Sequence, residues 1–231
     1  QIGHALTTLA SAQAGDGEAM RAALAQATRT LQLLGTESIS DTLAGITDSL
    51  PSLATELGKE PPHVTINAHG IVLRNQIVGL LKNVFTHLLR NSMDHGLETA
   101  AERQAAGKSA AGHINLEAGL ADGKLVLRLH DDGRGLAVSK IRQKAIDNGV
   151  ISADDQKSPE DIAQLIFASG FSTAERVTEV SGRGVGMDAV RGFLQKEGGN
   201  VAIRFTDQDA TADWRTFELV ITLPDKFAAQ S

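Results

Sequence analysis

The first 60 residues place apolar side chains at a helical spacing. The alternation of three- and four-residue steps appears in two runs: Met20, Leu24, Ala27, Leu31 and Leu34, then Ile39, Leu43, Ile46 and Leu50. This pattern predicts helix throughout residues 1 to about 60, with breaks near Gly15 and Gly35. Each run spans about two heptads of a coiled-coil seam. The region is therefore either a small helical bundle packed on its neighbour or a dimerisation hairpin.

Beyond Pro61-Pro62 the pattern changes to a mixture of strands and helices. Alternating or continuously apolar stretches predict strands at 63–71, 112–120, 124–130, 201–205 and 217–223. Helical spacing predicts helices at 73–94, 138–148, 159–168 and 187–197. Asp122-Gly123 favours a tight hairpin turn, and Ser158 before Pro159 is a plausible helix cap. These elements predict an α+β fold in which a helical region, 1–57, precedes a mixed domain, 58–231.

Composition narrows the function classes. The chain has 231 residues and no cysteine, which excludes disulfides and thiolate chemistry. Its net charge of −6 and its aromatic content of 3% argue against a nucleic-acid partner, because phosphates would be repelled and few rings could stack on bases. No apolar run approaches the roughly 20 residues that span a bilayer, so we expect no membrane contact by this segment.

Residues 87–96 form the first candidate motif, at the end of a predicted helix. His87, Asn91 and either Asp94 or His95 share one helix face, which therefore presents two imidazoles, an amide and a carboxylate. The opposite face is apolar. The alternative is the ordinary polar face of an amphipathic helix.

Residues 131–136 form the second motif, directly after a predicted strand. Asp131 at the strand end could accept a hydrogen bond from an amino group, and Gly133 and Gly135 would let a planar ligand approach the backbone. The alternative is a common Asp-Gly turn.

Residues 182–187 form the third motif, where a helix begins. Gly182, Gly184 and Gly186 alternate with Arg183 and Val185 before Met187. Backbone N–H groups at such a helix start can cradle phosphates. The alternative is a flexible glycine loop.

Taken together, the order and spacing of these motifs resemble the ATP-binding catalytic region of histidine kinases, most closely the chemotaxis (CheA) type. The resemblance runs from about Leu53 to Pro224 and includes Glu-Leu-Gly-Lys at 56–59 and the segment 166–173. It implies a two-layer α/β sandwich of the Bergerat type found in the GHKL ATPase superfamily, with ATP between the helices and a mixed sheet.

The resemblance also implies roles for single residues. Asp131 would bind the adenine amino group, and Asn91 would ligate Mg²⁺. Other groups would lie beside the phosphates: His87, Asp94, His95 and Lys140, with Ser172 and Thr173 less strongly supported. The segment Gly182, Arg183, Gly184, Val185, Gly186 and Met187 would form the hinge and floor of an ATP lid. Phe167 and Phe171 would pack the base of the lid or simply belong to the core.

Position 87 bears on the reaction. ATP hydrolases on the same fold carry a glutamate four residues before the asparagine, where this chain has His87. A histidine acceptor is already a nucleophile and needs no such base. We therefore predict a protein-histidine kinase with slow hydrolysis. The alternatives are a nucleotide-binding sensor or scaffold module without phosphotransfer, and a related ATP hydrolase.

The acceptor histidine is not evident. His4 lacks the acidic residue and proline that follow acceptor histidines in other histidine kinases, so a solvated helix histidine is the favoured interpretation. The expected partners are a separate histidine phosphotransfer domain, a response regulator and a second copy bound through residues 1–57. The chain starts at Gln1, and we expect one cytoplasmic piece of a larger, membrane-linked sensor. Arg103 and Lys108 are interpreted as ordinary surface charge.

Overall fold

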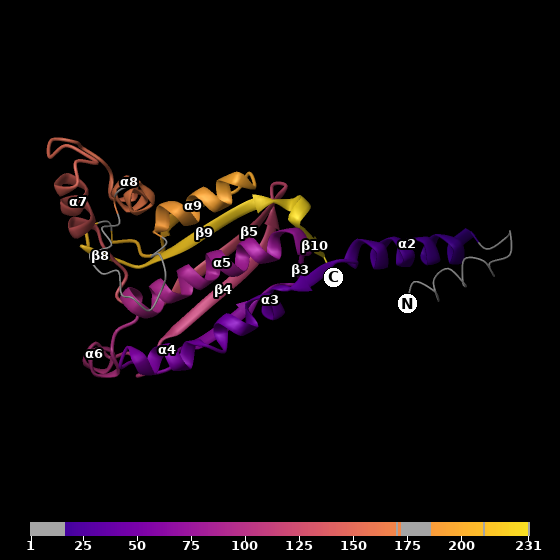
Figure 1. The fold of residues 1–231 in the computed structure, drawn as a ribbon, viewed down its shortest axis with the longest axis horizontal. Coiled ribbons are helices and arrows are strands. Elements are labelled where there is room, and N and C mark those ends of the chain that lie inside the picture. The colour runs from indigo at the N-terminus through magenta and orange to yellow at the C-terminus, as the bar shows by residue number, and fades with distance from the viewer. Residues whose placement is uncertain (1–16, 170, 172–185, 210, 231) are drawn as a thin grey trace.

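A five-stranded mixed sheet and the helices on one of its faces form the two layers of the molecule (Figure 1). The computed structural model describes residues 17–169, 171, 186–209 and 211–230. The strand order is β2-β4-β5-β9-β7. The strands are β2 (His63–Asn67), β4 (His113–Ala121), β5 (Lys124–Asp131), β9 (Phe217–Pro224) and β7 (Asn200–Phe205). Only the β2–β4 pair among them is parallel.

The sheet buries one face, as the alternating pattern requires. In β4 the inward side chains Ile114, Leu116 and Ala118 are each at most 3% exposed, and their neighbours point outward. The β4–β5 hairpin turns at Asp122 and Gly123, whose φ angles of 50° and 68° fit the predicted tight turn. The α+β, two-layer prediction is confirmed.

Helix α5 (Asn75–Asn91) is the central helix of the covering layer (Figure 1). Its apolar stripe is buried in the main core: Ile77, Leu81, Val84, Phe85, Leu88 and Leu89. Helix α9 (Met187–Lys196) packs beside it, and α3 (Ile39–Thr47) packs on its other side. The carboxyl end of α5 lies beside the start of α9, where Asn91 Nδ2 is 3.1 Å from the Met187 sulfur.

The remaining elements are short. The helical ones are η1 (Ser92–Gly96), α6 (Ala100–Ala105), α7 (Val138–Asp147), α8 (Pro159–Gln164), η2 (Leu165–Phe167) and η3 (Asp225–Phe227). The Ser158 hydroxyl accepts from the Asp161 backbone N–H and caps α8, as predicted. A second cluster of buried side chains joins α7 and α8: Ile141, Ala145, Ile151, Ile162 and Phe171.

The amino-terminal region is mostly helical and breaks near Gly35, as predicted, but the break contains a strand that was not predicted. Helices α2 (Gly17–Leu33), α3 (Ile39–Thr47) and α4 (Leu50–Glu56) are interrupted by a strand, β1 (Thr36–Ser38). Gly35, with φ 72°, ends helix α2, and β1 pairs with β3 (Ile71–Arg74). Ile39, Leu43 and Leu50 are buried in the same core as α5, so the second apolar run packs within this chain.

Residues 63–75 also depart from the prediction of one strand followed by a helix from Leu73. Two strands, β2 and β3 (Ile71–Arg74), are separated by a turn at His69 and Gly70, both with positive φ. Strand β3 is the centre of a small sheet, β1-β3-β10, completed by β10 (Ala228–Gln230). A further short pair, β6 (Leu136–Ala137) and β8 (Trp214–Arg215), was also not predicted. Across the described ranges, we found no helix with the length and apolar content needed to cross a bilayer.

Candidate nucleotide site

A cavity of about 440 Å³ lies between the sheet and the helices. Its volume falls in the range of small-molecule sites. The apolar lining residues are Leu88, Leu129, Leu136, Ile166, Phe171, Met187, Phe217 and Leu219. The polar and glycine lining residues are Asn91, Ser92, His95, Gly96, Asp131, Gly135, Lys144 and Gly186. Apolar walls with a few convergent polar groups are typical of a site that buries a planar, polar-edged ligand.

Asn91 is the last residue of α5 and lines this cavity. Asn91 follows Leu88 by three residues, and both side chains line the cavity, so Asn91 lies at the edge of the buried stripe rather than opposite it. Its amide Nδ2 lies 3.1 Å from the sulfur of Met187, the first residue of α9. The chain then continues as a wider turn, η1, whose carbonyls at Met93 and Asp94 accept from Lys59 Nζ at 2.5 and 3.1 Å.

Asp131 is the carboxylate at the end of β5, and it also lines the cavity. Its Oδ1 accepts from the Gly133 N–H at 3.1 Å. Burial raises the pKa of this carboxyl, and hydrogen bonds from the Ser92 hydroxyl and the Gly133 N–H oppose that rise only in part. A partly desolvated carboxylate with acceptor capacity left is suited to an amino group of a ligand.

The glycines of the 131–136 motif are explained by protein contacts. A Cβ on Gly133 would lie 2.2 Å from the carbonyl oxygen of Gly96, and one on Gly135 would lie 2.4 Å from that of Arg215. Gly135 also has φ 79°. The close approach expected for a planar ligand is thus made at these points by the protein's own backbone, and of the two glycines only Gly135 lines the cavity.

The remaining charged residues of the 87–96 motif lie at different places. His95 lines the cavity, whereas the Asp94 carboxylate is 3.5 Å from Arg90 Nε. His87 is half-buried, and burial together with the nearby Arg90 lowers its pKa, so its imidazole is neutral at neutral pH. Neither His87 nor Asp94 is among the described lining residues.

Two lysines of α7 take different positions. Lys140 Nζ lies 5.3 Å from the centre of the Trp214 ring and is not among the described lining residues. Lys144, one turn later, lines the cavity. Sequence reasoning missed Lys144, although its i,i+4 spacing from Lys140 places both on one helix face. Phe171 lines the cavity, and Phe167 is buried in the core.

Several predicted residues lie outside the described part of the chain. They are His4, Ser172, Thr173, Gly182, Arg183, Gly184 and Val185. Of the third motif the structure describes Gly186 and Met187, and both line the cavity.

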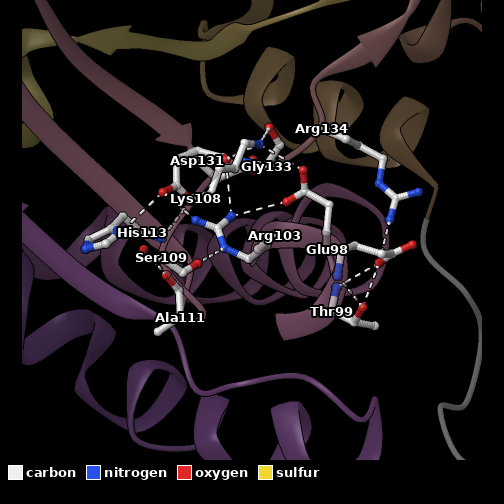
Figure 2. A network of polar contacts seen from close by, with 12 residues as sticks. Glu98, Thr99, Arg103, Lys108, Ser109, Ala111, His113, Asp131, Gly133 and Arg134 are labelled. Carbon is white, nitrogen blue, oxygen red and sulfur yellow. Dashed lines mark hydrogen bonds and ion pairs between the residues drawn. The ribbon is translucent and has the colours of Figure 1, made fainter. Parts of the chain in front are cut away.

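The interpretation of Arg103 as ordinary surface charge is wrong. Arg103 is fully buried, and Figure 2 shows it surrounded by polar groups beside the strand-end motif. Its guanidinium contacts Glu98 and Asp132, and Lys108 also contacts Glu98. Burial raises the pKa of Asp132, but hydrogen bonds from Arg103 and His113 outweigh that effect and lower it overall. Burial also raises the pKa of Glu98, but the hydrogen bond and charge of Lys108 and the charge of Arg103 lower it overall, so both carboxylates of this network are charged at neutral pH.

The cavity wall fits a metal ion that arrives with a phosphate ligand. The structure describes no group of three His, Asp or Glu side chains arranged to hold a metal. Mg²⁺ needs few protein ligands when it keeps its waters and binds phosphate oxygens. The Asn91 side chain offers one such ligand, its Oδ1, because its Nδ2 faces Met187.

Comparisons with known proteins agree with this geometry. The family model of histidine kinase-, DNA gyrase B- and HSP90-like ATPases matches residues 77–226. The chain is 47% identical over 127 residues to the chemotaxis protein CheA of Rhizobium meliloti, covering 55% of this chain and 17% of that protein. It is 44% identical over 151 residues to CheA of Klebsiella aerogenes, covering 65% of this chain and 23% of that protein.

The chain thus spans about a fifth of the length of these relatives. Among solved structures, the mycobacterial sensor histidine kinase MprB aligns with a TM-score of 0.49 at 13% identity. That alignment covers 82% of this chain and 95% of the other.

Proposed function

We propose that this chain, which belongs to the family of histidine kinase-, DNA gyrase B- and HSP90-like ATPases, is the catalytic core of a chemotaxis-type protein-histidine kinase. It binds Mg-ATP and transfers the γ-phosphoryl group to a histidine on a separate phosphotransfer domain, which then phosphorylates a response regulator. The observation that carries the proposal is a single cavity with Asn91 and Asp131 on its wall, in a chain 47% identical to a CheA protein over 127 residues.

The proposed base subsite centres on Asp131. Its carboxylate accepts a hydrogen bond from the adenine amino group, while Leu129, Ile166 and Leu219 on the apolar wall contact the ring. Guanine carries a carbonyl oxygen at the corresponding position, which a carboxylate repels. The same group therefore selects adenine over guanine.

The proposed phosphate subsite contains Asn91, His95 and Lys144, with Gly186 and Met187 at the start of α9. Asn91 Oδ1 would hold Mg²⁺ together with phosphate oxygens, and the ion would neutralise negative charge on the γ-phosphoryl group during transfer. The ammonium of Lys144 and the N–H groups at the start of α9 would hold phosphate oxygens. The predicted contributions of Asp94, Lys140, Ser172, Thr173 and residues 182–185 stay predictions.

In the proposed reaction the neutral imidazole nitrogen of the acceptor attacks the γ-phosphorus in line. The P–N bond forms as the bond from that phosphorus to the β,γ-bridging oxygen breaks, and ADP leaves with the electron pair. The imidazole then returns its extra N–H proton to water. His87 stands where a hydrolase would place its glutamate base, and it is neutral but not positioned on the cavity wall, so water attack receives little help.

Incubation with γ-labelled ATP and Mg²⁺, with and without a phosphotransfer domain, tests this proposal. We expect acid-labile, base-stable phosphate on the added domain and little free phosphate. Release of free phosphate alone would identify an ATP hydrolase instead. Nucleotide binding without either product would identify a sensor or scaffold module.

We also propose that two copies associate through the amino-terminal helical region, 1–57. Met20, Leu24 and Leu34 support this assignment, because each is about half exposed on or beside α2, which projects from the rest of the molecule (Figure 1). Analytical ultracentrifugation should give the mass of a dimer for the wild-type chain and a lower mass for Leu24→Glu. Ala22→Glu, on the opposite face of α2, is the matched control. A monomer at high concentration would contradict the assignment.

The proposed compartment is the cytoplasm, which supplies ATP.

A further inference from the structure

Arg103, on the short helix α6, is buried completely although its side chain is permanently charged. All of its interactions lie within one network. Its Nε donates to the Ser109 carbonyl at 2.7 Å, Nη1 to Glu98 Oε2 at 3.1 Å, and Nη2 to Asp132 Oδ2 at 2.8 Å. A buried cation is tolerated only when it is paired and hydrogen-bonded in this way.

Lys108 extends the same network to the backbone of the strand-end motif. Its Nζ donates to Glu98 Oε1 at 2.8 Å, to the Asp132 carbonyl at 3.0 Å and to the Gly133 carbonyl at 2.9 Å. Arg103 Nη1 also reaches the Asp132 carbonyl, at 3.3 Å. Two cations and two carboxylates thus fix the peptide groups of Asp132 and Gly133, as Figure 2 shows for the labelled members.

Asp132 and Asp131, at the end of β5, have different surroundings. Asp132 accepts from the His113 backbone N–H at 2.8 Å and from Arg103, and it is not among the described lining residues. Asp131 lines the cavity, and its Oδ1 accepts from the N–H of Gly133. The peptide that Arg103 and Lys108 hold is therefore the one that orients the Asp131 carboxylate.

The other side of this turn is fixed as tightly. The Arg134 N–H donates to the Gly96 carbonyl at 3.0 Å, and a Cβ on Gly96 would lie 2.9 Å from Asp131 Oδ2. The turn is thus held between η1 on one side and the Arg103 network on the other. Removing the network leaves the turn held by η1 and by the β4 backbone at His113, whose carbonyl accepts from the Asp132 N–H at 3.1 Å, but it frees the carbonyls of Asp132 and Gly133.

We infer that Arg103, assisted by Lys108 and Glu98, is a positioning residue that aligns the Asp131 carboxylate for the nucleobase and so sets the preference for adenine. The inference rests on the proposed ATP-binding function. Arg103 is not among the described lining residues and acts through Asp132 and Gly133. A displacement of about 1 Å in a binding group can cost about 10²-fold in function, so a loosened turn weakens recognition of the base and leaves the phosphate contacts in place.

The test compares ATP and GTP binding to Arg103→Lys, which keeps the charge but loses the planar fork that reaches two carboxylates at once. We expect the Kd for ATP to rise by about 10- to 100-fold, and the Kd for GTP to change by less than about 3-fold. Arg204→Lys is the control, because the Arg204 side chain is 62% exposed and pairs with Glu218, which is not among the described lining residues. Thermal unfolding midpoints are measured alongside.

An unchanged ratio of the Kd for GTP to the Kd for ATP would overturn the inference, because a general structural role would weaken the binding of both nucleotides equally. If Arg103→Lys does not fold, Lys108→Gln carries the test, because the Lys108 side chain is 33% exposed and tolerates replacement more readily. In Lys108→Gln, a fall in the ratio of the Kd for GTP to the Kd for ATP that is smaller than the fall expected for Arg103→Lys supports the inference. An unchanged ratio refutes it. A wild-type chain that binds neither nucleotide would instead contradict the proposed function.

Discussion

Two parts of the cavity wall differ in how completely the protein has arranged them. The Asp131 carboxylate already accepts hydrogen bonds from the Ser92 hydroxyl and the Gly133 N–H, and a buried charge network holds the adjoining turn. Among the described residues, the hydrogen-bond partner of the Asn91 amide is the sulfur of Met187, a weak acceptor, and Lys144 Nζ lies 5.3 Å from the centre of the Phe171 ring. The first part is ready for its ligand, whereas the second has polar groups whose better partners would be phosphates and a metal ion.

Asn91→Ala should have the largest effect, because it removes the proposed metal ligand from the less complete part. We expect the rate of phosphotransfer to fall by about 10²–10³-fold, by analogy with other groups that stabilise transition-state charge. The affinity for ATP without Mg²⁺ should change much less. Quench-flow with labelled ATP measures the first quantity and calorimetry the second. Asn83→Ala, an exposed asparagine on the same helix, is the control, and a full rate in Asn91→Ala would refute the role.

Asp131→Asn should weaken ATP binding by roughly 10- to 100-fold, the range for loss of a charge-assisted hydrogen bond. The amide keeps an oxygen for the Gly133 N–H, so the turn should survive. Asp122→Asn, at the exposed tip of the same hairpin, should bind ATP as the wild type does. Equal affinities in the two variants would remove Asp131 from the base subsite.

The pKa of Asp131 gives the same comparison a pH dependence. Burial raises this pKa, so the folded protein holds the proton more tightly than the unfolded chain does. The contribution of Asp131 to stability is therefore fully present below its unfolded pKa, and it is lost as the pH rises through the folded one. ATP needs the ionised carboxylate, so ATP binding should weaken about tenfold per unit once the pH falls below the folded pKa.

A pH series of calorimetric titrations measures this effect, with Asp131→Asn expected to lack that step. At neutral pH the free Asp131→Asn protein should unfold at a higher temperature than the wild type, since it buries no charge. A lower midpoint would contradict the raised pKa.

The smallest effect should distinguish the two lysines of α7. Lys144→Gln should weaken ATP binding by about 2- to 5-fold, as loss of a partly exposed ion pair would, and the difference should shrink at high salt. Lys140→Gln should have the smaller effect, because Lys140 lies over Trp214. Calorimetry at two salt concentrations measures both affinities. A larger loss of ATP affinity in Lys140→Gln than in Lys144→Gln would indicate that Lys140 is the lysine beside the phosphates.

The sequence predicted the site better where function depends on residue type and spacing than where it depends on burial. Asn91 and Asp131 were singled out because the order and spacing of their motifs resemble those of histidine kinases, and the structure brings both residues to one cavity. Arg103 could not be singled out, because nothing in Glu-Arg-Gln-Ala-Ala-Gly-Lys shows that the arginine is covered on every side. Lys140 and Lys144 share a helix face, so periodicity could not choose between them.

The two apolar runs at the start of the chain show the same limit for the fold. Both have helical spacing, yet Leu43 is buried in the core beside α5, whereas Leu24 is 58% exposed. Periodicity identifies an apolar face but not its partner. The strands β1, β3 and β10 were missed because three or four residues are too few to establish an alternation.

The small sheet has a consequence for how motion could travel through the chain. Strand β3 is hydrogen-bonded on one edge to β1, which follows α2, and on the other to β10 near the carboxyl end (Figure 1). It continues without a loop into α5, since Arg74 both ends the strand and caps the helix. A displacement of either flanking segment therefore acts on the first turn of α5. This helix is about 25 Å long, at 1.5 Å per residue, and it ends at Asn91.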